Sequence, residues 1–126
     1  MSDYRLEYRS RPWTLNVERQ GHHHHRARLV AEWRRAFDLL AREARVPAMS
    51  AVSVIAAPRV KDRRSIPDTA ACVGAVKAAI DGLRDAGVLV DDGPDVVRTV
   101  TFLAPEVRGY DSLVLHVAPV AVAVVA

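Results

Sequence analysis

One stretch of the sequence, residues 62 to 95, constrains the fold more than any other. It begins with a polar, turn-rich segment, continues through one amphipathic segment, and ends in the acidic run Asp91 to Asp95. Seven of the chain's 15 acidic residues fall within it, which indicates that ion or phosphate chemistry is organised around its central segment. That segment repeats apolar residues at the helical period and predicts a helix with one buried stripe, formed by Val73, Val76, Ile80 and Leu83.

The ends of this helix are also predicted from the residue types. Asp68 is placed to cap the N-terminus, with Thr69 as the alternative cap. The helix is expected to run to about Ala86, and Gly87 stands where a C-terminal cap is expected. A short extended piece, Val88 to Val90, then leads into the acidic turn.

The lysine in the middle of the helix has predictable neighbours. Lys77 lies at the edge of the apolar stripe, with Asp81 one turn further on. From Lys77 to Gly87 the helix rises roughly 15 Å, and the extended chain after Gly87 covers roughly 16 Å on its way back. Asp91 and Asp92 therefore return to the level of Lys77, and only one of them can face the helix.

The rest of the chain predicts a single α+β domain over residues 1–126, a small mixed sheet with two helices in the order β-α-β-α-β-β. Steps of four, four, three and four residues mark the first helix, from about Arg26 to Ala44, with apolar positions Leu29, Trp33, Phe37, Leu40 and Ala44. The strands are expected at Tyr4–Tyr8, Ala51–Val60 (broken or placed at an edge by Pro58), Val96–Leu103 and Ser112–Ala118, the last two as a hairpin turning at Gly109 to Asp111.

Composition indicates the size of the core and the cellular compartment that suit this chain. A chain of 126 residues with 50% apolar content has enough material for one hydrophobic core. Its single cysteine, Cys72, excludes an intrachain disulfide and fits a reducing, cytoplasmic setting. The N-terminus lacks the apolar core of a signal peptide. The apolar tail from Val117 is shorter than the ~20 residues that span a bilayer, so no membrane association is expected.

Charge is divided unevenly along the chain. Residues 1–64 carry 14 Arg and Lys against 7 Asp and Glu, a net charge of +7, whereas residues 65–126 carry 4 against 8, a net charge of −4. Sixteen of the 18 basic residues are arginine, which favours bidentate contacts with phosphate or carboxylate. Codon bias accounts for the preference for arginine over lysine but not for the segregation. A basic half joined to an acidic half suits a protein that grips a polyanion and carries out metal chemistry on it.

Four consecutive histidines, His22 to His25, precede the first helix. The favoured interpretation is a solvated basic loop that approaches DNA phosphates. A zinc or nickel site is the alternative, although adjacent side chains diverge and only His22 and His25 share a helical face. An affinity tag is a third possibility. His116 lies in a predicted strand and is expected to be structural.

The motif around the second helix resembles a known family. The run Lys77 to Leu83 (KAAIDGL), followed by Ala86 to Asp92 (AGVLVDD), is similar to the central motif of the RusA family of Holliday junction resolvases, which are common in phages and prophages. The family pattern is an arginine-rich stretch, Asp-x-Asp-Asn, a short gap, Lys-x-x-x-Asp-x-Leu and a hydrophobic return to Asp-Asp. The order of elements also fits, from about Leu6 to Ala118.

The resemblance implies a homodimeric endonuclease, dependent on Mg²⁺ with Mn²⁺ possible, that cuts branched DNA such as four-way junctions in a bacterial cytoplasm. Asp68, Lys77 and Asp92 would be catalytic, with Lys77 at the scissile phosphate or the attacking water. The resemblance further implies that Asp68, Asp91 and Asp92 are metal ligands. The DNA contacts that it implies are Asn16, Arg19, Arg63 and Arg64.

At one point this chain departs from the family pattern. Before the helix it has one carboxylate, Asp68, nine positions ahead of Lys77, where the family has two aspartates and an asparagine. The other ligand would then be missing or come from Asp62, Asp81 or Asp95. Two further functions stay open beside the nuclease, a non-catalytic relative that binds branched DNA and a small phage protein that modulates a host factor.

Overall fold

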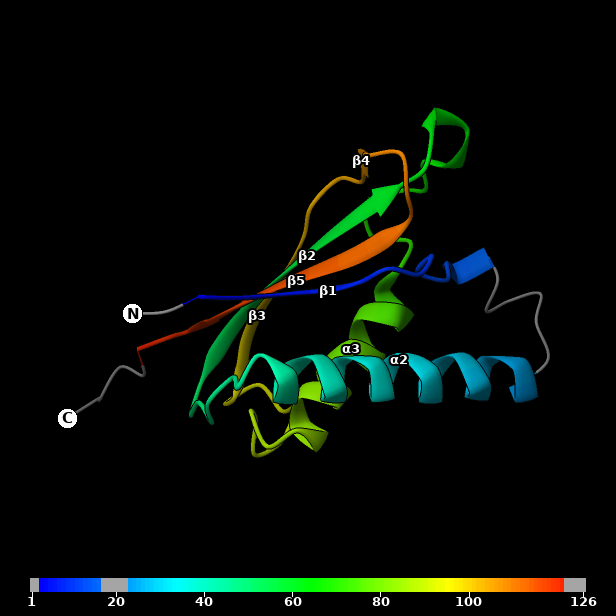
Figure 1. Cartoon of the computed structure of the whole chain (residues 1–126). Coiled ribbons are helices and arrows are strands. Elements are labelled where there is room, and N and C mark those ends of the chain that lie inside the picture. Colours follow the sequence, from blue (N-terminus) through cyan, green and yellow to red (C-terminus); the bar gives the residue numbers. More distant parts are fainter. Residues whose placement is uncertain (1–2, 17–22, 122–126) are drawn as a thin grey trace.

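The structure is a computed structural model that describes residues 3–16 and 23–121. It confirms an α+β domain in which two helices pack on one face of a five-stranded mixed sheet (Figure 1). In the described part of the chain no helix has the length and apolar character to cross a membrane. The predicted β-α-β-α-β-β order is confirmed, with a short extra strand and a 3₁₀ turn added. The elements are β1 (Tyr4–Tyr8), α2 (His23–Glu43), β2 (Val52–Val60), η1 (Arg63–Ser65), α3 (Val73–Asp85), β3 (Val97–Phe102), β4 (Glu106–Val107) and β5 (Ser112–Pro119).

The strand order is β1-β5-β2-β3, with β4 also paired to β2. The predicted hairpin between the last two long strands is therefore wrong, because β2 lies between β3 and β5. After β3 the chain continues along the edge of β2 as β4, turns at Gly109 (φ 80°) and enters β5 on the other side of β2. Burial explains this choice. Strand β5 is buried on both faces over most of its length and suits the interior, whereas β3 is mostly exposed and suits an edge.

Strand β2 is central and continuous, so the predicted break at Pro58 is wrong. Its burial alternates strictly, with Val52, Val54 and Ala56 facing the helices. Pro58 lies opposite the interruption in the parallel partner, between the end of β3 at Phe102 and the start of β4. A missing backbone N–H is tolerated at such a gap.

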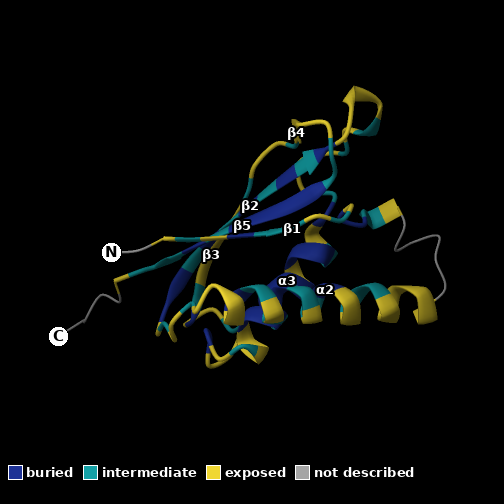
Figure 2. Ribbon diagram, viewed as in Figure 1, coloured by how far each residue is buried: buried dark blue, intermediate teal, exposed yellow. Residues whose placement is uncertain are grey.

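The core fills the space between the sheet and the two helices, as the buried colouring in Figure 2 shows. Trp33 and Phe37 of α2 are almost completely buried, and Tyr8 of β1 meets the Trp33 ring edge-on with 4.9 Å between centroids. Helix α2 begins at His23, so His23 to His25 are helical and exposed rather than part of the predicted loop. His22 lies outside the described residues.

The end of α2 also differs from the prediction. The helix ends at Glu43, and Ala44 is exposed. Ala41 takes its place in the buried stripe beside Trp33 and Phe37. Arg45 adopts a left-handed conformation (φ 54°), which stops the helix before Pro47.

Helix α3 starts later than its sequence predicts. Its N-cap is Cys72, which makes no side-chain capping hydrogen bond, so capping by Asp68 or Thr69 is wrong. Residues 69–72 form a turn in which the Ala71 N–H donates to the backbone oxygen of Asp68 at 3.0 Å. Val73 consequently lies in the first turn and is exposed rather than buried.

The predicted C-terminal end of α3 is confirmed. The helix ends at Asp85, and Gly87 takes the left-handed conformation (φ 81°) expected of a C-cap glycine. Its N–H donates to the Arg84 oxygen, and the Val88 N–H donates to the Leu83 oxygen, each at 3.0 Å. These two bonds reverse the chain and send it back along α3.

Candidate functional site

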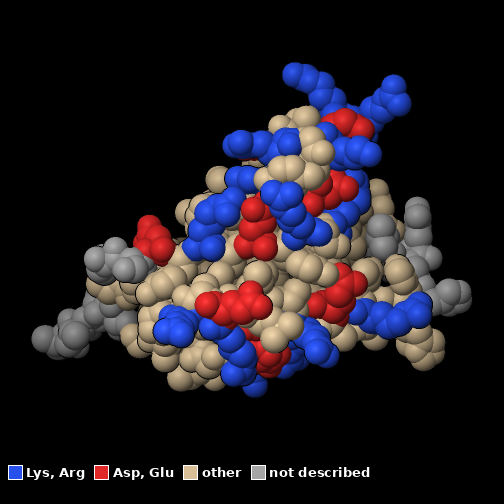
Figure 3. Space-filling view, in the orientation of Figure 1, with Lys and Arg blue, Asp and Glu red and all other residues tan. Residues whose placement is uncertain are grey.

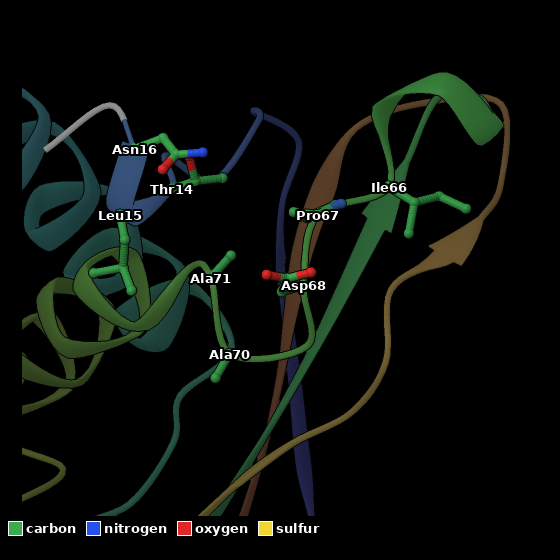
Figure 4. Close-up of a pocket in the computed structure, with 8 residues that line it drawn as sticks. All are labelled: Thr14, Leu15, Asn16, Ile66, Pro67, Asp68, Ala70 and Ala71. Atoms are coloured by element: carbon green, nitrogen blue, oxygen red, sulfur yellow. The ribbon is translucent and has the colours of Figure 1, made fainter. Parts of the chain in front are cut away.

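A pocket of about 550 Å³ opens at the N-terminal end of α3 (Figure 4). One wall comes from the segment that follows β1 and the other from the segment that leads into α3. A backbone hydrogen bond of 2.9 Å from the Leu15 N–H to the Ala71 oxygen ties the two segments together. The lining residues are Thr14, Leu15, Asn16, Ile66, Pro67, Asp68, Ala70 and Ala71.

The polar groups of this pocket are available to a ligand. Figure 4 shows Thr14 and Asn16 on one side and Asp68 across from them. Within the described part of the chain, none of these three side chains makes a hydrogen bond or an ion pair. Because the late start of α3 frees the Asp68 carboxylate from capping, the pocket holds a carboxylate, an amide and a hydroxyl that have no partner among the described residues.

A second cluster lies on α3 itself. The ammonium of Lys77 donates to Asp81 Oδ1 at 2.8 Å and also to Asp92 Oδ2. The predicted return of the acidic turn to the level of Lys77 is therefore confirmed. Asp92 faces the helix, whereas Asp91 Oδ1 accepts from the Gly93 N–H at 2.7 Å. As predicted, only one of the two adjacent aspartates reaches the lysine.

The charges of this cluster stabilise one another. Partial burial alone would lower the pKa of Lys77, but the hydrogen bonds from its ammonium to Asp81 and Asp92 outweigh that effect and raise it. The hydrogen bond from Lys77 in turn holds the pKa of Asp92 below its ordinary value, with a smaller contribution from the neighbouring Asp81 carboxyl. Lys77 is therefore a fixed cation near neutral pH.

An ion pair that sequence spacing did not reveal lies beside the cluster. Arg34 of α2 donates to both carboxylate oxygens of Asp85 in α3, from Nε at 2.5 Å and from Nη2 at 2.7 Å. Arg42 donates to the backbone oxygen of Asp85 at 2.8 Å and pairs with Asp38 at 2.6 Å. These contacts hold α2 against the last turn of α3. No periodicity links residues on different helices, so no sequence signal identifies the pair.

Because of the Arg34–Asp85 ion pair, we expect the stability of the protein to depend on pH. The hydrogen bonds from Arg34 lower the pKa of Asp85 from its ordinary 3.8, so the pair contributes stability above pH 3.8 that is lost as the pH falls through the lowered value. Because both side chains are partly exposed, we expect Asp85→Asn to cost about 0.5–1 kcal/mol at pH 7 and less at pH 2. Urea unfolding at the two pH values measures this. The exposed Asp95→Asn is the control, and a cost that is equal at both pH values would contradict the assignment.

A basic tip projects from the end of β2, where Figure 3 shows Lys and Arg side chains gathered. We define the tip as Lys61, Arg63, Arg64 and Ile66, which lie in η1 or within two residues of it. The three cations are exposed and, in the described ranges, their side chains have no hydrogen-bond or ion-pair partner. Two of them, Arg63 and Arg64, are predicted DNA contacts. Of the other two predicted DNA contacts, Asn16 lines the pocket and Arg19 lies outside the described residues.

The remaining predicted residues are not all brought together. Across residues 3–16 and 23–121 no group of three or more His, Cys, Asp or Glu could hold a metal ion, so Asp68, Asp91 and Asp92 do not form one ligand set. The Asp68 carboxylate makes no hydrogen bond or ion pair with Lys77 or Asp92. Asp62 instead stabilises η1, because its carboxylate accepts from the Arg64 N–H at 3.0 Å and from Ser65 Oγ at 3.1 Å.

The predicted residues that the structure describes thus fall into three features, the pocket, the Lys77 cluster and the basic tip. Comparison with models of known protein families and with curated protein sequences finds no match for this chain. What the site can do follows from its own geometry.

Proposed function

We propose that the protein is a structure-selective endonuclease that binds branched DNA and hydrolyses a phosphodiester bond with Mg²⁺ or Mn²⁺. The observation that carries this proposal is that Asn16 and Asp68 line the same pocket. The two residues lie far apart in the sequence, the RusA resemblance names both, and neither side chain has a partner among the described residues.

The pocket suits a hard divalent cation. Magnesium and manganese prefer carboxylate, carbonyl and water oxygens, and Mg²⁺ keeps several of its waters while taking one or two carboxylates from the protein. Asp68 would hold the ion, with the Asn16 amide oxygen and the Thr14 hydroxyl in reach of its waters. A bound Mg²⁺ supplies polarisation of the phosphate and activation of water.

Lys77 would contribute a positive charge at the phosphate. The ammonium is oriented by Asp81 and Asp92, and Lys77 lies one helical turn, roughly 6 Å of rise, beyond the start of α3. A fixed cation beside a phosphate offsets the negative charge that develops in the transition state. Asp92 is in this view a residue that positions Lys77.

The tip cations would bind the phosphates of the DNA backbone. Lys61, Arg63 and Arg64 have no protein counter-ions in the described structure, so their contacts with phosphates release counterions without first breaking ion pairs. A homodimer would present two pockets to the two opposed strands of a junction. Such a protein would serve recombination, repair or phage DNA processing in a bacterial host.

A second candidate, a non-catalytic protein that binds branched DNA, is favoured by two observations. Lys77 already has two carboxylate partners, and the described residues contain no group of three metal ligands. This candidate keeps the tip and the pocket as DNA-binding features and predicts binding without cleavage.

The variant Asp92→Asn tests the proposal. Loss of the carboxylate removes one of the two groups that orient Lys77, and we expect cleavage of a four-way junction to fall by about 100-fold. Junction binding is expected to stay within about twofold, since Asp92 adds no positive charge to the DNA surface. Gel assays of cutting in Mg²⁺ and of binding in EDTA measure the two effects. Unchanged cutting by Asp92→Asn would refute the proposed role.

A further inference from the structure

The apolar side chain at the tip occupies an unusual position. Ile66 is 48% exposed and immediately follows η1. On one side of it are Arg63 and Arg64, whose side chains have no partner among the described residues, and on the other it lines the pocket with Asp68. A large apolar side chain is therefore exposed between two cations and the pocket.

Exposed apolar residues are common, and a single one needs no explanation. Leu39 on α2 has nearly the same exposure, 47%, and Val100 in β3 is 37% exposed. Neither lines the pocket. Position relative to the pocket and the cations distinguishes Ile66 from these residues.

The backbone around Ile66 is held in place. The Arg11 guanidinium donates to the Ser65 oxygen at 3.2 Å, just before Ile66. The Asp62 carboxylate closes the 3₁₀ turn, and Pro67 restricts Ile66 to the extended conformation that it adopts (φ −69°, ψ 111°). The side chain is therefore presented on a fixed backbone.

We propose, on the basis of the proposed function, that Ile66 is a wedge that enters a base step at the branch point of the DNA. Apolar side chains such as isoleucine unstack base steps in several architectural DNA-binding proteins. Unstacking costs free energy in a continuous duplex, and it costs less where stacking is already interrupted, as at a junction centre. The wedge thus gives the protein its preference for branched over linear DNA.

A fluorescent base at the branch point tests the wedge. A synthetic four-way junction carries 2-aminopurine beside the crossover, and binding is measured in EDTA so that no strand is cut. Wild-type protein is expected to raise the fluorescence several-fold. Ile66→Ala is expected to leave it unchanged, to weaken junction binding by about tenfold, and to leave the affinity for a linear duplex unaltered. Leu39→Ala is the matched control and should behave as wild type, and Ile66→Leu should restore the rise.

The outcomes separate the two proposals. Binding of wild-type protein to the junction with no change in fluorescence would overturn the wedge and leave the proposed function intact. A full rise with Ile66→Ala would do the same. Wild-type protein that binds neither junction nor duplex would overturn the proposed function itself, and the wedge with it.

Discussion

Replacing Asp68 with asparagine is expected to reduce junction cleavage by about 100-fold or more. Asparagine keeps the shape of the side chain but removes the negative charge that would bind Mg²⁺. Because Asp68 does not cap α3 and has no protein partner in the described structure, the substitution leaves the fold unchanged. Circular dichroism and thermal unfolding should match wild type, and junction binding in EDTA should be equal or slightly tighter.

Asp95→Asn is the matched control for this prediction. Asp95 is an exposed carboxylate of the same segment and does not line the pocket, so its loss should change cleavage by less than about twofold. A rise in the Mg²⁺ concentration needed for half-maximal cutting by Asp68→Asn would support metal binding at Asp68. Equal cleavage by wild type and Asp68→Asn at every Mg²⁺ concentration would exclude Asp68 from the site.

Replacing Gly82 with alanine is expected to destabilise the protein by about 2–4 kcal/mol. At an exposed position of a helix the same change stabilises a protein by about 1 kcal/mol, so the expected change in the free energy of unfolding has the opposite sign here. The reason is the close approach of α2 to α3 at Gly82. An added Cβ would overlap the Arg34 carbonyl oxygen and lie 3.0 Å from the Asp38 nitrogen and 3.1 Å from Phe37 Cβ. Backbone atoms cannot rotate away, so the helices would have to separate.

Thermal unfolding measures this effect, with an expected fall in Tm of about 10 °C. Arg84→Ala, an exposed change two residues further along the same helix, should shift stability by less than about 0.5 kcal/mol. Because Lys77 and Asp81 lie on the same helix, a separated α3 should also reduce cleavage. An unchanged or higher Tm for Gly82→Ala would show that the helices are further apart than the structure has them.

Residue spacing within one segment was enough to predict the Lys77 cluster correctly. The i, i+4 relation fixes Asp81 beside Lys77 within one helix, and the combined lengths of the helix and the returning chain placed Asp92 at the same level. Gly87 supplied the turning point because only a left-handed residue reverses the chain there. Each of these inferences depends on geometry within a single segment.

Contacts between segments were beyond prediction from the sequence. The capping preference of Asp68 is a local tendency, and the turn at residues 69–72, bonded through Ala71 to Leu15, overrides it. The hairpin prediction failed for the same kind of reason, since the nearly complete burial of β5 requires a place inside the sheet. The meeting of Asn16 and Asp68 in one pocket likewise depends on tertiary packing, and the family resemblance named the two residues in separate roles without placing them together.

Cleavage of a synthetic four-way junction tests the central claim most directly. Wild-type protein is incubated with an end-labelled junction, and with a linear duplex of the same arm sequences, in Mg²⁺, Mn²⁺ or EDTA. The proposed function predicts paired cuts near the branch point in the presence of either metal, none in EDTA and none in the duplex. Binding of the junction with no cut in either metal, or equal cutting of the linear duplex, would contradict it.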